Sequence, residues 1–156
     1  MTKEQRVALI TGGSRGIGKA IVLQLARDRV KVAVNYKANQ QAADSVVEEV
    51  VGMGGEAVAV QGDVGNRSDV EKMMKKAVDS LGSIDILVNN AGIIHDSLLM
   101  RMSEEVWDNV INTNLKGAYY CTKAVLSSMV RQRWGRIINV VSVVGIEGNP
   151  GQSNYA

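Results

Sequence analysis

The sequence lacks several residue types that would point to particular chemistries. Its 156 residues include no phenylalanine, one proline, one cysteine and one histidine, and the formal net charge is only +2. The single cysteine, Cys121, excludes an internal disulfide, so the chain suits a reducing compartment and Cys121 is expected to be a buried small apolar residue. His95 stands without the CxxC or HExxH spacing of metal sites, so no metal is predicted. The small charge gives no reason to expect a nucleic-acid partner.

Long hydrophobic runs are also absent. No stretch of about 18 uncharged apolar residues occurs, and the apolar run before Thr11 is too short for a signal sequence. We therefore expect no membrane segment and a cytoplasmic protein. Apolar residues still make up 46% of the chain, which is enough for a buried core and argues against disorder. The length fits a single domain over residues 1–156.

What the sequence does contain is an alternation of short apolar runs and amphipathic stretches. Runs rich in valine and isoleucine are typical of strands that are covered on both faces. We predict five such strands, at 6–10, 31–35, 56–61, 84–89 and 136–142. Parallel neighbours need right-handed crossovers packed on alternate faces of the sheet. The expected fold is therefore α/β, a Rossmann-like doubly wound parallel sheet.

The stretches between these runs predict crossover helices. One helix is expected within 40–55, with an apolar face and a glycine-rich end. That face comprises Val46, Val47, Val50 and Val51, and the end comprises Gly52, Gly54 and Gly55. A second is expected within 66–83, where Ser68 and Glu71 form an S-x-x-E capping box before residues at helical spacing. Those residues are Val70, Met73, Met74 and Ala77.

A third amphipathic stretch runs from Ser103 to Trp134 and predicts one long helix. Its apolar residues include Val106, Val110, Leu115, Val125 and Met129. Glu104 and Glu105 lie in its first turn and Arg131 and Arg133 in its last, as the helix dipole favours.

The stretch "TGGSRGIG" (11–18) follows the first strand and opens a helix. Gly12, Gly16 and Gly18 allow a tight turn and a close backbone approach, and helix N-terminal N–H groups favour a pyrophosphate. The spacing is G-x-x-x-G-x-G, which differs from the G-x-G-x-x-G fingerprint. A glycine cluster is by itself only a turn; the strand before it and the βαβ pattern after it favour a dinucleotide site.

The second strand is followed by "VNYKANQ", without the acidic residue that holds a ribose 2′-OH. Arg15 and Lys37 instead offer cations for a 2′-phosphate, and Asn35 offers a hydrogen-bond donor. This pattern favours NADP(H) over NAD. The alternative is that Lys37 is an ordinary solvated lysine.

Six short motifs in register resemble those of the short-chain dehydrogenase/reductase family, and the resemblance covers the whole chain. They are "TGGSRGIG", "GDV" (62–64), "NNAG" (89–92), "INTNLKG" (111–117), "INVVSVVG" (138–145) and "NYA" (154–156). Two further stretches, "HDSLLMRM" (95–102) and "GNPGQSNYA" (148–156), resemble reductases of 3-oxoacyl groups carried by acyl carrier protein in bacterial-type fatty-acid synthesis.

The resemblance implies where the cofactor lies. Asp63 and Val64 are expected to border the adenine, and Asn90, Ala91 and Gly92 are expected to pass under the ribose and nicotinamide end. Alternatives are that Asp63 only caps a helix and that "NNAG" is only a strand-end turn. The predicted cofactor-binding residues are Gly12, Ser14, Arg15, Gly16, Ile17, Gly18, Asn35, Lys37, Asp63, Val64, Asn90, Ala91, Gly92 and Tyr155.

For catalysis the family pattern implies Ser142, Tyr155 and Asn114. Ser142 and Tyr155 would hydrogen-bond the ketone oxygen while Tyr155 donates a proton. Asn114 would sit at a local kink with its backbone carbonyl on a water. Since a phenol has a pKa of about 10, it needs a nearby cation. The family supplies this cation as a Lys four residues after the Tyr, at position 159, so we expect the sequence to stop inside its catalytic motif.

Three functions stay open at this point. The first is NADPH-dependent reduction of 3-oxoacyl thioesters, with Arg133 as a candidate contact for an acidic carrier protein. The alternative is that Arg133 is only a cation at a helix end. The second is reduction of acetoacetyl-CoA or another carbonyl compound, and the third is a noncatalytic dinucleotide-binding module. The resemblance implies a homo-oligomer, a tetramer at full length. An isolated chain of residues 1–156 is expected to expose the strand 136–144 at a sheet edge and to lack normal turnover.

Overall fold

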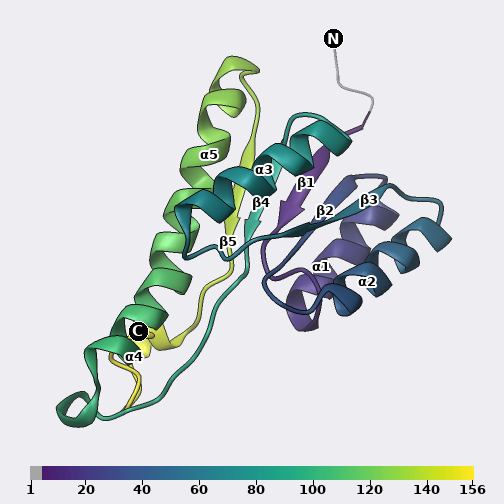
Figure 1. The fold of residues 1–156 in the computed structure, drawn as a ribbon. Helices are drawn as coiled ribbons and strands as arrows, with labels where there is room; N and C mark the ends of the chain where they lie inside the picture. Colours follow the sequence, from purple (N-terminus) through teal and green to yellow (C-terminus); the bar gives the residue numbers. More distant parts are fainter. Residues whose placement is uncertain (1–4) are drawn as a thin grey trace.

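A computed structural model describes residues 5–156 and contains one five-stranded parallel sheet, with strand order β3-β2-β1-β4-β5 (Figure 1). The strands are β1 Val7–Ile10, β2 Lys31–Tyr36, β3 Ala57–Gln61, β4 Ile86–Asn89 and β5 Arg136–Asn139. Every strand pair in this sheet is parallel. The order runs outward from β1 in both directions, which confirms the predicted doubly wound α/β fold.

Helices cover both faces of the sheet. The α-helices are α1 Gly16–Arg27, α2 Gln40–Gly52, α3 Arg67–Leu81, α4 Glu104–Ile111, α5 Gly117–Arg131 and the short α6 Val144–Glu147. A 3₁₀ turn spans Leu99–Arg101, and a π-helical turn, η2, spans Asn112–Lys116. In Figure 1, α1 and α2 lie on one side of the sheet, and α3 and α5 lie on the other.

Alternate residues of the same strand supply two separate cores. Leu9 of β1 packs in the cluster that α3 and α5 complete with Met73, Val125 and the fully buried Cys121. The neighbouring Ala8 and Ile10 pack on the opposite face, with residues of α1 and α2. Because both faces are covered, β1 is apolar throughout rather than alternating, which is the pattern that predicted a buried parallel strand.

Two details of the predicted crossover helices are wrong. The helix α3 begins at Arg67, and its N-cap is Asn66, whose Oδ1 accepts a hydrogen bond from the Asp69 N–H at 3.2 Å. Ser68 therefore lies inside the first turn, and Glu71 pairs with Arg67 instead of closing a capping box. In α2, Val46 and Val50 are buried, but Val51 is 57% exposed because it points past the edge of the packed face.

The predicted long helix is interrupted, and the fifth strand is shorter than predicted. The π-helical turn separates α4 from α5 and shifts the helical phase, so Leu115 is exposed instead of buried. Arg133 lies beyond the end of α5 with φ +55°. The strand β5 ends at Asn139 because its neighbour β4 ends at Asn89, the residue paired with Asn139. Val140 still donates its N–H to the Asn89 carbonyl oxygen at 2.9 Å, and positions 141 and 142 lie beyond the ladder.

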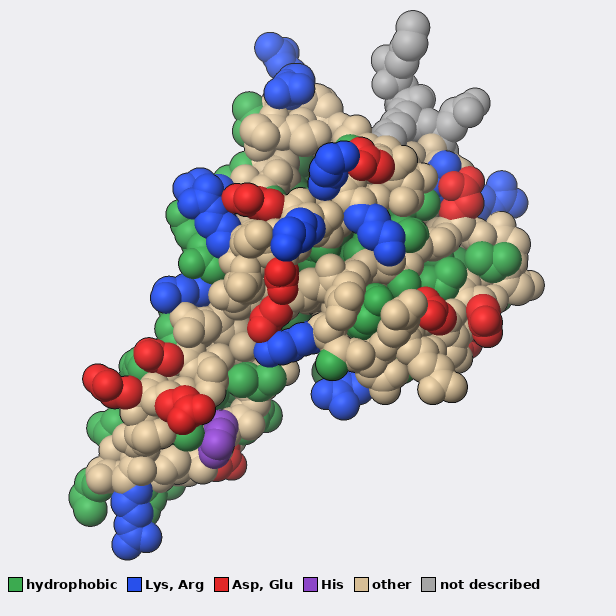
Figure 2. Space-filling view, in the orientation of Figure 1, with side chains coloured by type: hydrophobic (Ala, Val, Ile, Leu, Met, Phe, Trp, Pro, Cys, Tyr) green, Lys and Arg blue, Asp and Glu red, His purple; other side chains and the backbone are tan. Residues whose placement is uncertain are grey.

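The charged side chains of both signs are mixed on the surface visible in Figure 2, where basic and acidic side chains are interspersed rather than gathered by sign. Within residues 5–156, no helix combines the length and the apolarity needed to cross a bilayer.

Candidate functional site

The candidate site is a pocket of about 540 Å³ at the carboxyl ends of the strands. It lies where β1 and β4 diverge into crossovers on opposite faces, the place where doubly wound sheets bind ligands. Every predicted cofactor-binding residue except Tyr155 lines it. Six further lining residues were not predicted: Ala38, Asn39, Ala42, Gly62, Ile93 and Thr113. Five of the six lie within five residues of a predicted cofactor-binding residue in the sequence, and Thr113 is next to Asn114, a predicted catalytic residue.

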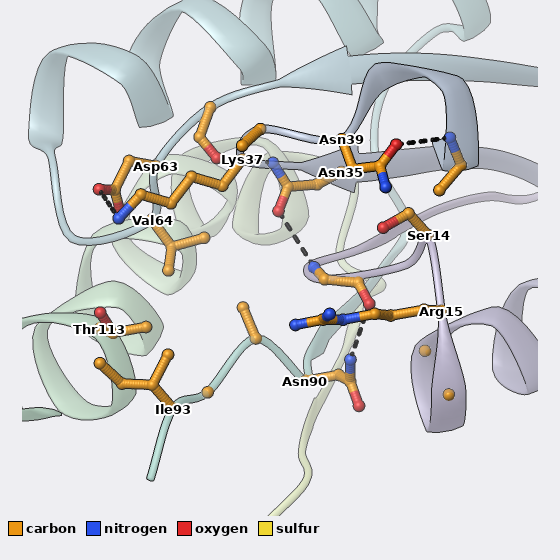
Figure 3. Close-up of a pocket in the computed structure, with 18 of the residues that line it drawn as sticks. Ser14, Arg15, Asn35, Lys37, Asn39, Asp63, Val64, Asn90, Ile93 and Thr113 are labelled. Carbon is orange, nitrogen blue, oxygen red and sulfur yellow. Dashed lines mark hydrogen bonds and ion pairs between the residues drawn. The ribbon is translucent and has the colours of Figure 1, made fainter. Parts of the chain in front are cut away.

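The glycine-rich turn after β1 forms one wall of the pocket (Figure 3). Gly12 and Gly16 have φ values of +62° and +53°, a region that favours glycine. A Cβ on Gly18 would lie 2.2 Å from the carbonyl oxygen of Gly12. The turn and the start of α1 therefore approach more closely than any side chain allows. Arg15, the N-cap of α1, makes no side-chain capping bond, which leaves the helix N-terminus facing the pocket uncapped by protein.

Thr11 and Asn90 join this turn to the loop after β4. The Thr11 Oγ1 accepts hydrogen bonds from the backbone N–H groups of Asn90 and Ala91, both at 2.9 Å. In return the Asn90 Nδ2 donates to the carbonyl oxygens of Thr11 at 2.9 Å and Gly12 at 3.2 Å. Asn90 thus shapes the wall of the pocket. Sequence reasoning missed Thr11, although a polar residue directly after a fully apolar strand was the available signal.

Asn35 is a buried residue that links strand ends, which corrects the role predicted for it as a donor to the ligand. It lines the pocket at the end of β2, but only 2% of its surface is exposed. Its Oδ1 accepts from the Gly12 N–H at 3.1 Å, and its Nδ2 donates to carbonyl oxygens that include that of Gly62 at 3.0 Å. Because the amide is engaged in this way, Asn35 holds the ends of β1, β2 and β3 together. It does not offer the free donor that the sequence suggested.

Lys37 and Asp63 meet at the rim of the pocket, where the dashed line in Figure 3 joins their side chains. The Lys37 Nζ lies 2.7 Å from the Asp63 Oδ2. The Asp63 Oδ1 accepts the Gly65 N–H at 2.9 Å. Burial alone raises the pKa of Asp63, but the hydrogen bonds from Lys37 and Gly65 and the lysine charge outweigh burial and lower that pKa. The N-cap of α3 is Asn66, so Asp63 is not the helix cap.

Asn114 lies in the π-helical turn, beside the pocket residue Thr113. Its Oδ1 accepts the Ile93 N–H at 2.9 Å, and its Nδ2 donates to the Ile93 carbonyl oxygen at 2.9 Å. This pair of bonds fixes the chain that follows Gly92 against the helix. The break in helical geometry at Asn114 is the kink that the family resemblance implied, and its cause is an i→i+5 turn.

Ser142 and Tyr155 lie in turns outside the ladder, and neither is among the residues of 5–156 that line the pocket. The Ser142 Oγ accepts the Val144 N–H at 3.2 Å. The Tyr155 N–H donates to the Gln152 carbonyl oxygen at 3.0 Å. A Cβ on Gly145 would lie 3.3 Å from the carbonyl oxygen of Ala156, so the segments that carry Ser142 and Tyr155 are adjacent.

The segment before Tyr155 packs on the chain that follows the pocket. The Gln152 Nε2 donates to the Asp96 Oδ1 at 2.9 Å, and the Asn154 Nδ2 donates to the His95 carbonyl oxygen at 3.2 Å. The Ser97 N–H donates to the Gly151 carbonyl oxygen at 2.8 Å. These bonds place the Tyr155 turn beside the chain that Asn114 anchors.

Among residues 5–156, no three His, Cys, Asp or Glu side chains gather to hold a metal ion. Cys121 is buried as predicted, and burial raises the pKa of its thiol to about 12.

A doubly wound parallel sheet with a glycine-rich turn at the divergence of β1 and β4 defines the dinucleotide-binding class of α/β domains. The sequence profile described as short chain dehydrogenase matches residues 6–156. The chain belongs to this family. Membership implies a nicotinamide dinucleotide cofactor.

Curated relatives share more than half of their aligned residues with this chain. It is 54% identical over 151 residues to the 3-oxoacyl-[acyl-carrier-protein] reductase of Synechocystis sp., covering 97% of this chain and 61% of the relative. It is 53% identical to the 3-oxoacyl-[acyl-carrier-protein] reductase FabG of Staphylococcus epidermidis. That alignment covers 95% of this chain and 61% of the relative. It is 52% identical to the 3-oxoacyl-[acyl-carrier-protein] reductase FabG of Staphylococcus aureus. That alignment covers 98% of this chain and 62% of the relative. The chain thus spans about three-fifths of the length of these relatives.

Proposed function

We propose that the protein reduces 3-oxoacyl thioesters, carried on acyl carrier protein, to 3-hydroxyacyl thioesters with NADPH. The observation that carries the proposal is that the predicted cofactor residues at the ends of four strands, β1 to β4, line one pocket. The names of the relatives, all 3-oxoacyl-[acyl-carrier-protein] reductases, support the substrate class. The close packing of α1 on the turn at Gly18 supports a pyrophosphate site, because it brings the helix N-terminus, which favours anions, next to the glycine-rich turn.

When bound, the dinucleotide supplies the hydride for the carbonyl carbon. Side chains of the protein then stabilise the negative charge that develops on the carbonyl oxygen. In this proposal the Ser142 hydroxyl donates a hydrogen bond to that oxygen, and the Tyr155 hydroxyl donates the proton. Asn114 acts by anchoring Ile93 and by offering its backbone carbonyl to a water of the proton relay.

We assign the preference for NADPH to Arg15 and Lys37. Both line the pocket, and no acidic residue occurs in the stretch 35–41 that follows the core of β2. Two cations without an acid at that position favour a 2′-phosphate over a 2′-hydroxyl. Asn35 is left out of this role because its amide is engaged by backbone groups.

The proposal is tested with the full-length gene product by following NADPH absorbance. The substrates are an acetoacetyl group on acyl carrier protein and the same group on coenzyme A. We expect turnover with NADPH and faster turnover with the carrier-bound substrate. Faster turnover with coenzyme A would favour the second function, an acetoacetyl-CoA or related carbonyl reductase. Cofactor binding without turnover on either substrate would favour a noncatalytic dinucleotide-binding module.

Matched variants separate chemistry from binding. Tyr155→Phe removes only the hydroxyl and is expected to lower kcat by at least about 100-fold while NADPH affinity stays near that of the wild type. Tyr119→Phe removes the same group from an exposed tyrosine on α5 and is expected to leave kcat unchanged. Full activity of the Tyr155 variant would overturn the assigned mechanism.

The proposal also includes the assembly and the location of the protein. We propose that the full-length protein is a homo-oligomer, a tetramer, and that it is cytoplasmic.

A further inference from the structure

An ion pair bridges the rim of the pocket at the ends of β2 and β3. Lys37 extends from the residue after β2, and Asp63 lies two residues after the end of β3. Their side chains meet at 2.7 Å, and both residues line the pocket (Figure 3). Lys37, the cation assigned above to a ligand phosphate, is therefore already paired with a carboxylate of the same pocket.

The two partners are not equally fixed. One oxygen of Asp63 accepts the Gly65 N–H at 2.9 Å, and the side chain is 29% exposed. Lys37 is 70% exposed, and the pairing with Asp63 is the one interaction of its ammonium group found within residues 5–156. When an anionic group enters, the carboxylate stays in place and the long lysine side chain moves.

The ion pair is weak enough to exchange for a ligand. Pairs between exposed side chains are worth little, since water competes for both charges. A phosphate carries more charge than a carboxylate and accepts short charge-assisted hydrogen bonds. Arg15, the other cation assigned to the pocket, forms no ion pair within residues 5–156. Of the two cations, Lys37 is therefore the one that is paired with a carboxylate.

We propose that Asp63 sets the cofactor preference by competing with a 2′-phosphate for Lys37. The inference rests on the proposed function and adds a specificity-determining residue to it. Asp63 lowers the preference for NADPH over NADH. A nucleotide with a 2′-hydroxyl leaves the Lys37–Asp63 pair intact. A nucleotide with a 2′-phosphate draws Lys37 away and leaves Asp63 held by Gly65.

The test measures the dissociation constants of NADP⁺ and NAD⁺ by calorimetry with the full-length protein. The readout is the dissociation constant of NAD⁺ divided by that of NADP⁺. Any contact of residue 63 with the adenosine, which both nucleotides contain, affects both constants equally and cancels in this ratio. Asp63→Asn keeps an acceptor for Gly65 and frees Lys37, so the ratio should rise about two- to fivefold, the range of an exposed ion pair. Lys37→Gln should lower it by at least about fivefold.

The double variant and a control complete the design. With Lys37 absent, Asp63→Asn should have no further effect, so the double variant should match Lys37→Gln. Asp79→Asn breaks the Lys75–Asp79 pair on the exposed face of α3, removes the same charge, and should leave the ratio unchanged. An equal rise in Asp79→Asn would show that net charge rather than competition is responsible and would overturn the inference.

A second measurement needs no variant. In the wild type, the NMR signal of the Lys37 side chain should shift on addition of NADP⁺ and stay unchanged with NAD⁺. A ratio unaffected by Asp63→Asn, or a Lys37 signal that both nucleotides move equally, would overturn the inference while leaving the proposed function standing. Failure of the wild-type protein to bind either nucleotide would overturn both.

Discussion

The sheet from β1 to β4 and the segment from β5 onward (residues 136–156) are built differently. In the first region the strands are covered on both faces, and all four residues of β1 are at most 1% exposed. In the second region β5 pairs only with β4 within residues 5–156, and Ile138 is 49% exposed. Val141 and Ile146, further along, are 83% and 88% exposed. One region is a filled interior, and the other is an open edge.

The two regions also hold their loops by different means. In the first, polar groups of Thr11, Asn35 and Asn90 tie strand ends together beside the glycine-rich turn, and each is buried or half-buried. In the second, a chain of side-chain amides around Gln152 ties one loop to another. Loops fixed to a buried sheet form a defined pocket, whereas the loop before Tyr155 is fixed to residues 95–97 and does not line that pocket. The following predictions test that difference.

The largest effect is expected at Gly18. Gly18→Ala places a Cβ 2.2 Å from the Gly12 carbonyl oxygen, which forces α1 away from the turn. We expect a loss of about 3 kcal/mol in the free energy of unfolding and a loss of nucleotide binding. Urea unfolding and cofactor titration measure the two. Gly52→Ala, the control, meets open space at the end of α2 and should change stability by less than about 0.5 kcal/mol. Equal effects at both sites would show that the turn is not tightly packed.

The next effect is expected at Thr11. Thr11→Val preserves the shape but removes the oxygen that accepts the Asn90 and Ala91 N–H groups. Two donors then lack a partner, which is expected to cost about 2 kcal/mol in the free energy of unfolding. Thr11→Ser keeps the hydroxyl and should recover most of that stability. A valine variant as stable as the serine variant would contradict the role given to this hydroxyl.

A smaller effect is expected in the second region, at Gln152. Gln152→Ala removes the hydrogen bonds with Asp96 and Asn149 and should cost about 1 kcal/mol. The consequence should be local: hydrogen exchange at the Ser97 N–H should accelerate while exchange in β1 stays slow. Gln24→Ala, which removes an exposed bond to Asp28, is the control and should leave Ser97 unaffected. Acceleration throughout β1 would contradict the separation of the two regions.

The smallest effect is a shift in one titration. The pKa of Asp63 lies below its ordinary value of 3.8, so its contribution to stability is present above that value and is lost as pH falls through the folded pKa. Lys37→Gln removes the stabilising cation and should raise the pKa of Asp63, so this contribution becomes smaller and disappears at a higher pH. Carbon-13 NMR titration of the carboxyl measures it. Lys75→Gln should leave that pKa unchanged; an unshifted Asp63 in the Lys37 variant would contradict the pairing.

Much of the first region was predictable because local and global preferences agree there. The runs at 6–10 and 31–35 are strands within one residue of the predicted bounds, since buried parallel strands need apolar residues at every position. The glycine-rich turn was predicted for a similar reason, because its backbone conformation excludes side chains. Helix starts were less predictable: Asn66 and Ser68 are both good caps, and tertiary placement of the chain after Asp63 selected Asn66.

The sequence by itself determined the order of strands and helices, the two-faced core and the position of the glycine-rich turn, because each follows from residue size and apolarity at successive positions. Only the tertiary structure decided what the polar groups do. It engaged the Asn35 amide with backbone groups and paired Lys37 with Asp63. Hydrogen bonds and ion pairs depend on which groups meet across the fold, and that depends on distances between residues far apart in the chain.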